Sequence, residues 1–104
     1  MIARLWHGVT EATKSDEYLG YLNQTEVPDY QATTGNRGVY VFRKIEDDKT
    51  HFLLLSLWES EDAIRQFAGP EIQRARYYPD DEKFLLELEP TVQHYEALVR
   101  PKGE

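Results

Sequence analysis

Three histidines and two adjacent tyrosines are the residues of this 104-residue chain best suited to acid–base chemistry. His7 lies in the first apolar segment, and an imidazole titrates near neutral pH, so it can remove a proton from an acidic phenol or enol. We predict that His7 and Tyr77 are catalytic, with the Tyr77 hydroxyl donating a hydrogen bond to a substrate oxygen. Leu5, Phe67 and Tyr78 are predicted to bind the substrate in the same cavity. The alternative is a structural histidine and aromatic rings that only complete the core.

The other histidines, His51 and His94, do not form a metal-binding motif in the sequence. No pair of histidines has the H-x-H or H-x-x-x-H spacing, and the chain has no cysteine, which removes thiolate ligands, disulfides and a cysteine nucleophile. The sequence also lacks the glycine-rich phosphate-binding loops and the G-x-S-x-G nucleophile motif. We therefore expect no metal site and no cofactor.

Length and charge restrict the classes of protein further. A chain of 104 residues fits one domain, which we assign to residues 1–104. A net charge of −7, with acidic residues spread along the chain, argues against a nucleic-acid partner. No apolar run reaches the roughly 20 residues that span a bilayer, and the N-terminus does not resemble a secretory signal. We expect a cytoplasmic protein without a membrane partner.

The stretch from His51 to Gly69 predicts a strand that leads directly into a helix. Its first part is an almost unbroken apolar run, typical of a strand covered on both faces. Ser60 is placed as a helix N-cap, and acidic residues follow in the first turn, where the helix dipole favours negative charge. Apolar residues then recur at helical spacing until Gly69, which is expected to end the helix.

The remaining segments complete a βαββαβ order. Residues 34–38, TGNRG, are the strongest turn signal, because glycine and asparagine tolerate positive φ. Residues 83–89 fit either a helical turn or an extended segment, and the other expected elements are strands at 1–9, 39–45 and 92–99 and helical segments at 12–24, 28–32 and 71–78. This order predicts the ferredoxin-like α+β fold, an antiparallel sheet with helices on one face.

Alternation along the first strand divides its side chains between the two faces of the sheet. We assign the face with His7 to the helix side and the face with Trp6 to the opposite side. A second copy of the chain would then cover the Trp6 face, so we predict a homodimer through the sheet. At that seam Arg4 and Glu96 could form a buried ion pair.

These segments resemble the antibiotic biosynthesis monooxygenase family of the dimeric α+β barrel superfamily. The resemblance rests on the strand–helix junction LLLSLWESEDAIRQFAG, on the turn GNRGVY and on the closing segment PTVQHYEAL, and it covers nearly the whole chain. It implies a cofactor-independent monooxygenase-like protein that acts on a small aromatic or quinone-type compound. The alternative is a non-catalytic dimeric protein that binds a small ligand or is associated with a stress response.

The haem-degrading branch of that family is a further possibility that the residues argue against. The resemblance implies an Asn, a Trp and a His at the positions that His7, Phe67 and Tyr77 occupy here. All three differ, and tyrosine is a less usual haem ligand than histidine. We therefore expect no haem degradation.

Overall fold

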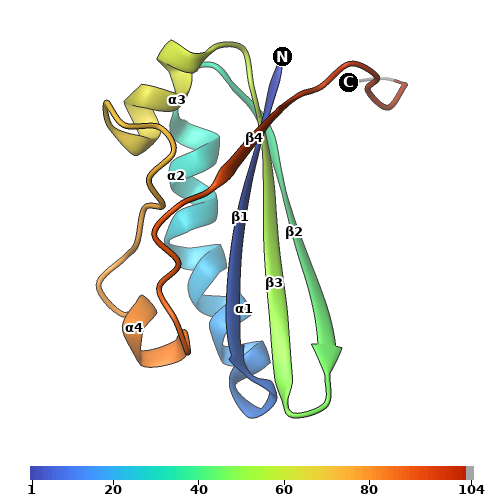
Figure 1. Cartoon of the computed structure of the whole chain (residues 1–104), viewed down its shortest axis with the longest axis vertical. Helices are drawn as coiled ribbons and strands as arrows, with labels where there is room; N and C mark the ends of the chain where they lie inside the picture. Colours follow the sequence, from blue (N-terminus) through green and yellow to red (C-terminus); the bar gives the residue numbers. More distant parts are fainter. Residues whose placement is uncertain (103–104) are drawn as a thin grey trace.

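The structure, a computed structural model, describes residues 1–102 of the chain. Its first half contains a long strand, two consecutive helices and a β-hairpin, and its second half contains two short helices and a short strand (Figure 1). In chain order the elements are β1 (Ile2–Glu11), the 3₁₀ turn η1 (Ala12–Lys14), α1 (Ser15–Gln24), α2 (Glu26–Ala32), β2 (Asn36–Glu46), β3 (Lys49–Trp58), α3 (Glu61–Ala68), α4 (Asp81–Phe84) and β4 (Gln93–Glu96). No helix within this described part is long and apolar enough to span a membrane.

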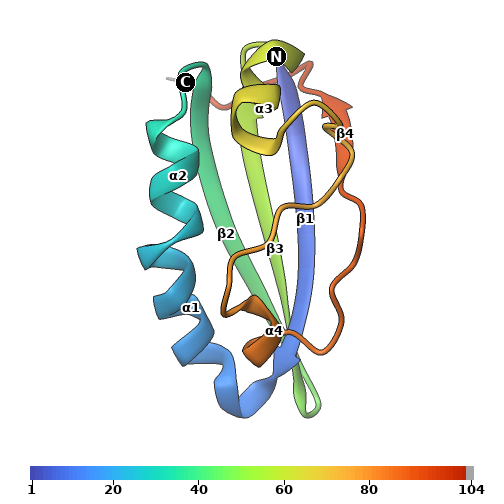
Figure 2. The same ribbon diagram turned by 90° about the vertical axis from the view of Figure 1, so that its left-hand side faces the viewer.

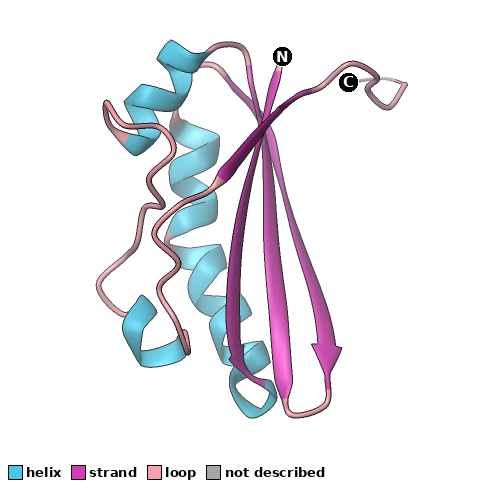
Figure 3. Ribbon diagram, viewed as in Figure 1, coloured by secondary structure: helices cyan, strands magenta, loops and turns pink. Residues whose placement is uncertain are grey.

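The four strands form one antiparallel sheet in the order β2-β3-β1-β4, which confirms the predicted ferredoxin-like α+β fold. Strands β2 and β3 are joined by a hairpin, and β1 lies between β3 and β4 (Figure 3). The helices all lie against the same face of the sheet, as a quarter turn of the molecule shows (Figure 2). The opposite face, here called the open face, carries none of the helices of residues 1–102.

The β3–α3 junction has the structure that the sequence predicts. The Ser60 hydroxyl accepts a hydrogen bond from the Ala63 amide at 3.1 Å, so Ser60 is the N-cap of α3. Gly69 follows the helix with φ of 91°, a value that favours glycine. These features are encoded by neighbouring residues, which explains why the sequence alone was sufficient to predict them.

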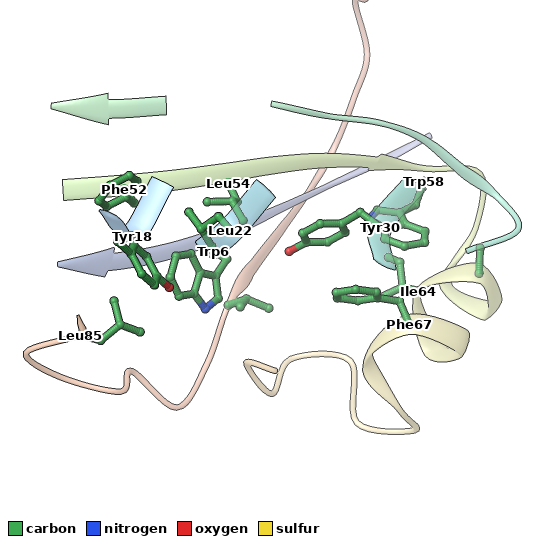
Figure 4. Packing of buried hydrophobic residues seen from close by; sticks show 12 residues of the cluster. Trp6, Tyr18, Leu22, Tyr30, Phe52, Leu54, Trp58, Ile64, Phe67 and Leu85 are labelled. Carbon is green, nitrogen blue, oxygen red and sulfur yellow. The ribbon is translucent and has the colours of Figure 1, made fainter. Parts of the chain in front are cut away.

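Aromatic side chains fill the space between the sheet and the helices. Two groups are visible, one around Trp6 and Tyr18 and the other around Trp58 and Phe67 (Figure 4). Tyr30 stacks on Phe67 with ring centroids 4.3 Å apart, and both side chains are at least 95% buried. The space in which a substrate cavity was expected is therefore occupied by packed side chains.

The assignment of faces on β1 was wrong. Arg4 and Trp6 are buried on the helix side, with 1% and 2% of their surface exposed, whereas Leu5 and His7 lie on the open face. Gly8 makes this packing possible, because a Cβ atom there would lie 2.4 Å from the Trp6 ring. Apolar residues occupy both faces of this strand, so alternation alone could not show which face the helices cover.

The segment 71–78 is irregular and does not form the predicted helix. The Ala75 amide donates to the Pro90 carbonyl, and the Val92 amide donates to the Gln73 carbonyl, which ties the segment to the chain that precedes β4. The Arg4 guanidinium also uses carbonyl groups of this segment, those of Ile72 and Arg74. These long-range bonds take up the backbone groups that a helix would need.

Candidate functional site

The open face presents rows of side chains from three neighbouring strands. The register places His7 opposite Leu53 and Val9 opposite His51, so the two histidines are diagonal neighbours on β1 and β3. Phe42 on β2 lies opposite Leu53 in the same row as His7. Two imidazoles are thus held on paired strands beside apolar side chains.

His7 contacts a carboxylate on one side and a second imidazole on the other. Its Nδ1 lies 2.6 Å from Glu89 Oε2, and its Nε2 lies 3.0 Å from His51 Nδ1. The far nitrogen of His51, Nε2, is 3.6 Å from Glu46 Oε1. The four side chains therefore form a series in the order Glu89, His7, His51, Glu46, and all are partly exposed.

The hydrogen bonds of this series determine which nitrogen of each imidazole carries a proton. An ionised Glu89 only accepts, so Nδ1 of His7 is the donor and its Nε2 carries the lone pair when the ring is neutral. In the neutral pair His51 then donates from Nδ1 to His7, which leaves the His51 Nε2 lone pair free. A proton taken up by the pair would be stabilised by a carboxylate at each end. This is the arrangement of a general base with orienting groups.

A hollow of about 320 Å³ opens beside the two histidines. Phe42 and Leu53 contribute apolar surface to it, and Lys44 and Glu46 also line it. The volume is at the lower end of the range for small-molecule sites. A single or fused aromatic ring is the size of compound that this space would accept.

Tyr77 approaches the same carboxylate residue from the helix side. Its hydroxyl donates a hydrogen bond to the Glu89 carbonyl, and its ring lies edge-on to Trp6 with centroids 6.1 Å apart. Burial, followed by the negative charge of Glu89, raises the pKa of Tyr77 to about 12. His7 and Tyr77 therefore both contact Glu89, but they do so from opposite faces of the sheet.

The predicted substrate-binding residues are also divided between the faces. Leu5 shares the open face with His7, while Phe67 is buried on the helix side. The Tyr78 hydroxyl donates to Asp29 Oδ2 at 2.6 Å, and its ring packs against the Arg76 guanidinium. The prediction that these five residues line one cavity between sheet and helices was wrong, because alternation on β1 was assigned to the wrong faces.

A buried cluster of ionisable side chains on the helix side was not predicted from the sequence. Arg4 and Glu26 are both 1% exposed, and the Tyr30 hydroxyl donates to Glu26 Oε2 at 3.0 Å. Arg4 Nη1 also lies 3.1 Å from His94 Nε2. Arg4 is thus part of the core and does not lie at a dimer seam with Glu96. An arginine inside an otherwise apolar alternation was the one signal that could have revealed this cluster.

Glu26 is expected to make the folded state less stable as the pH rises. Burial raises the pKa of Glu26 from 4.5 to about 8, so the folded state keeps a proton that the unfolded state has lost. The contribution of Glu26 to the free energy of unfolding should therefore be greatest below pH 4.5. Between pH 4.5 and 8 this contribution should fall by at most about 1.4 kcal/mol per pH unit. Urea unfolding at several pH values measures this slope.

Glu26→Gln is the matched control, since it retains the shape and removes the titration. The pH dependence should be weaker in this variant than in the wild type between pH 4.5 and 8. Equal slopes in the two proteins would show that Glu26 is not the group responsible.

The fold and the size of the chain place it in a known class of small α+β proteins. The antibiotic biosynthesis monooxygenase family matches residues 11–76, which is more than half of the chain. The chain belongs to the antibiotic biosynthesis monooxygenase family. No curated protein matches it.

Solved structures with the same fold have low sequence identity to this chain. A Bordetella bronchiseptica protein, whose name places it among antibiotic biosynthesis monooxygenases, has 20% identity and a TM-score of 0.62 over 94% of this chain and 97% of its own. MhuD of Mycobacterium tuberculosis, a haem degrader with two haems in its active site, has 15% identity and a TM-score of 0.59 over 97% and 99%. Rv0793 of the same organism has 12% identity and a TM-score of 0.58 over 95% and 96%. At these identities the likeness concerns the fold alone.

Haem does not fit the described side chains of the helix side as they are packed. Tyr30, Trp58 and Phe67 are in mutual ring contact there and occupy the layer between sheet and helices. His94 is the histidine on that side, and its Nε2 faces Arg4. A porphyrin would have to displace this aromatic group and would meet a histidine already engaged.

Proposed function

We propose that this protein is a cofactor-independent monooxygenase-like enzyme for a small aromatic or quinone-type compound. The supporting observation is the 2.6 Å contact between His7 and Glu89, beside His51 and an apolar-walled hollow. The His7–His51 pair takes the role of base, and Leu5 and Leu53 belong to the surface that the ring contacts. Tyr77 acts as a positioning residue through Glu89. Phe67 and Tyr78 support the core under this proposal.

The proposed reaction begins with a proton transfer from a phenolic hydroxyl to the histidine pair. The phenolate is electron-rich and passes electrons to O₂, which forms a carbon–oxygen bond on the ring. Loss of water then leaves the quinone. For a dihydroxynaphthalene the balance is C₁₀H₈O₂ + O₂ → C₁₀H₆O₃ + H₂O, in which the ring is oxidised, one oxygen atom is incorporated and the other is reduced to water. The chain supplies orientation and the proton acceptor.

Oxygen uptake with a panel of dihydroxynaphthalenes tests this proposal. We expect uptake above the rate without protein, with one quinone formed for each O₂ consumed. Saturable binding of a member of the panel without any uptake would favour the non-catalytic ligand-binding alternative. If no member of the panel binds and none causes oxygen uptake, the enzymatic proposal and the ligand-binding alternative are both contradicted.

We also propose a cytoplasmic location for the protein, which cell fractionation tests.

We also infer a homodimer through the open face, because this face exposes large apolar side chains. Tyr40 and Tyr95 are 40% and 56% exposed in rows of this face that do not include His7. Sedimentation at micromolar concentration should give twice the chain mass, and Leu55→Glu, in the middle of this face, should give monomers. Ile45→Glu is the control, since Ile45 is exposed but alternates to the other face of β2. A monomeric wild type would contradict the dimer.

Haem titration is expected to give no shift of the Soret band. The reason is the packed aromatic group of the helix side, together with the engagement of His94 by Arg4. Free haem in the same buffer provides the reference spectrum. A saturable Soret shift would contradict this expectation and would favour a haem-binding function.

A further inference from the structure

An ion pair lines the hollow next to the histidine pair. The Lys44 ammonium lies 2.9 Å from Glu46 Oε2, and both residues line the hollow. Lys44 is directly opposite His51 in the register of β2 and β3, and the Cβ atoms of such cross-strand pairs stand about 4.5–5.5 Å apart. The other oxygen of Glu46, Oε1, is 3.6 Å from His51 Nε2. Lys44, Glu46 and His51 are therefore grouped around one part of the hollow.

This part of the hollow is where a phenolic hydroxyl would lose its proton. In the neutral histidine pair the free lone pair is on His51 Nε2, so a phenol would donate to that nitrogen. The phenolate oxygen would then stand near Glu46, which is ionised at neutral pH because the Lys44 hydrogen bond and charge lower its pKa. The positive charge gained by the histidine pair is already shared with Glu89 at its other end. A further cation is therefore needed to favour the phenolate.

Lys44 is the side chain that can provide this cation. Arg43 also lines the hollow, but its guanidinium donates to Ser15 Oγ at 3.0 Å and to Asp16 Oδ1 at 2.7 Å. Lys44 has three N–H donors on a flexible stem, and its side chain is 70% exposed, so its ammonium can retain Glu46 and still reach an oxygen in the hollow. A cation directed at an oxygen that becomes negative lowers the barrier to that step.

We propose that Lys44 is a catalytic residue whose ammonium donates a hydrogen bond to the phenolate oxygen formed beside His51. Glu46 holds the ammonium in place from the other side. This inference rests on the proposed enzymatic function, since it assigns a second role in the same hollow. It also defines the substrate more narrowly, because only a ring with a free hydroxyl group gains from the ammonium, and the methyl ether of the same ring does not.

Binding of 4-nitrophenol, an unreactive analogue whose phenolate absorbs visible light, tests the proposal without turnover. Lys44→Met should lower the ratio of bound phenolate to bound phenol about tenfold at a given pH, and Lys44→Arg should restore most of it. Lys83→Met is the matched control, because Lys83 on α4 is 72% exposed and pairs with Asp80. 4-Nitroanisole cannot ionise and should bind equally to wild type and Lys44→Met. Circular dichroism confirms that each variant is folded.

A second variant separates contact with the phenolate from an effect that acts only through Glu46. Glu46→Gln removes a negative charge near the phenolate, so it should raise the ratio of phenolate to phenol. Adding Lys44→Met to Glu46→Gln should still lower this ratio if the ammonium touches the phenolate oxygen. No change in the double variant relative to Glu46→Gln would contradict that contact.

Two results would overturn the assignment of Lys44. One is the same ratio in wild type, Lys44→Met and Lys83→Met, and the other is the absence of saturable 4-nitrophenol binding by the wild type. Oxygen uptake with dihydroxynaphthalenes, measured separately, should fall about tenfold in Lys44→Met. Uptake that Lys44→Met leaves unchanged would remove Lys44 and leave the enzyme in place. The expected 4-nitrophenol ratios without any uptake would contradict the enzyme and leave Lys44 in a phenol-binding site.

Discussion

Replacing His7 with alanine is expected to lower oxygen uptake by about 100- to 10,000-fold, the usual contribution of a general base, because the His7–His51 pair takes up the proton as a unit. The variant removes the imidazole that Glu89 orients and leaves His51 without its hydrogen-bond partner. Because the side chain is only partly buried, we expect the fold to survive the change. Initial rates with the best substrate of the dihydroxynaphthalene panel measure the effect.

Two further variants separate a catalytic role of His7 from a structural one. Glu89→Gln keeps the size of the side chain but removes the charge beside His7, so it should reduce the rate less than His7→Ala does. His94→Gln alters a histidine on the helix side and should leave the rate unchanged. Equal rates in wild type and His7→Ala would remove His7 from the mechanism.

Replacing Trp58 with alanine is expected to lower the free energy of unfolding by about 3–5 kcal/mol. Trp58 is fully buried and contacts Tyr30 and Phe67, with ring centroids 6.1 and 5.7 Å away. Its Nε1 donates to Ser56 Oγ at 2.9 Å, so the variant also leaves a buried hydroxyl without its partner. Urea unfolding at a fixed protein concentration measures the loss, since the proposed dimerisation would make stability depend on concentration.

Trp58→Phe provides an intermediate case, because it retains an aromatic ring but loses the N–H donor and part of the buried ring volume. Ile45→Ala, at a residue that is 59% exposed, should change the stability by no more than about 0.5 kcal/mol. If Trp58→Ala cost no more than Ile45→Ala, the aromatic group would not be the centre of the core.

The fold could be predicted from the sequence where neighbouring residues determine the structure. Ser60 and Gly69 mark the start and the end of α3 through contacts with the helix itself. The apolar run that precedes them in the sequence forms β3 as expected. The segment 71–78 was mispredicted because its backbone bonds lead to Arg4 and to the chain before β4. Spacing within a segment contains no information about such distant partners.

The candidate site was only partly predictable for the same reason. His7 was recognised from its residue type, but its partner Glu89 is 82 positions away and nothing in either segment links them. The face of the sheet on which His7 lies was predicted wrongly, because the neighbouring residues Leu5 and Trp6 point to opposite faces of β1 and are both apolar. The buried position of Arg4 also conflicts with the usual exposure of charged residues, so the core cluster with Glu26 was missed.

The most direct test of the central claim is to locate the bound aromatic compound by nitrogen-15 NMR of the histidine rings. A dihydroxynaphthalene added under argon cannot be turned over, so the spectra report binding alone. We expect the ring signals of His7 and His51 to shift with saturation, while those of His94 stay in place. Shifts confined to His94 would place the compound on the helix side and would contradict an open-face site.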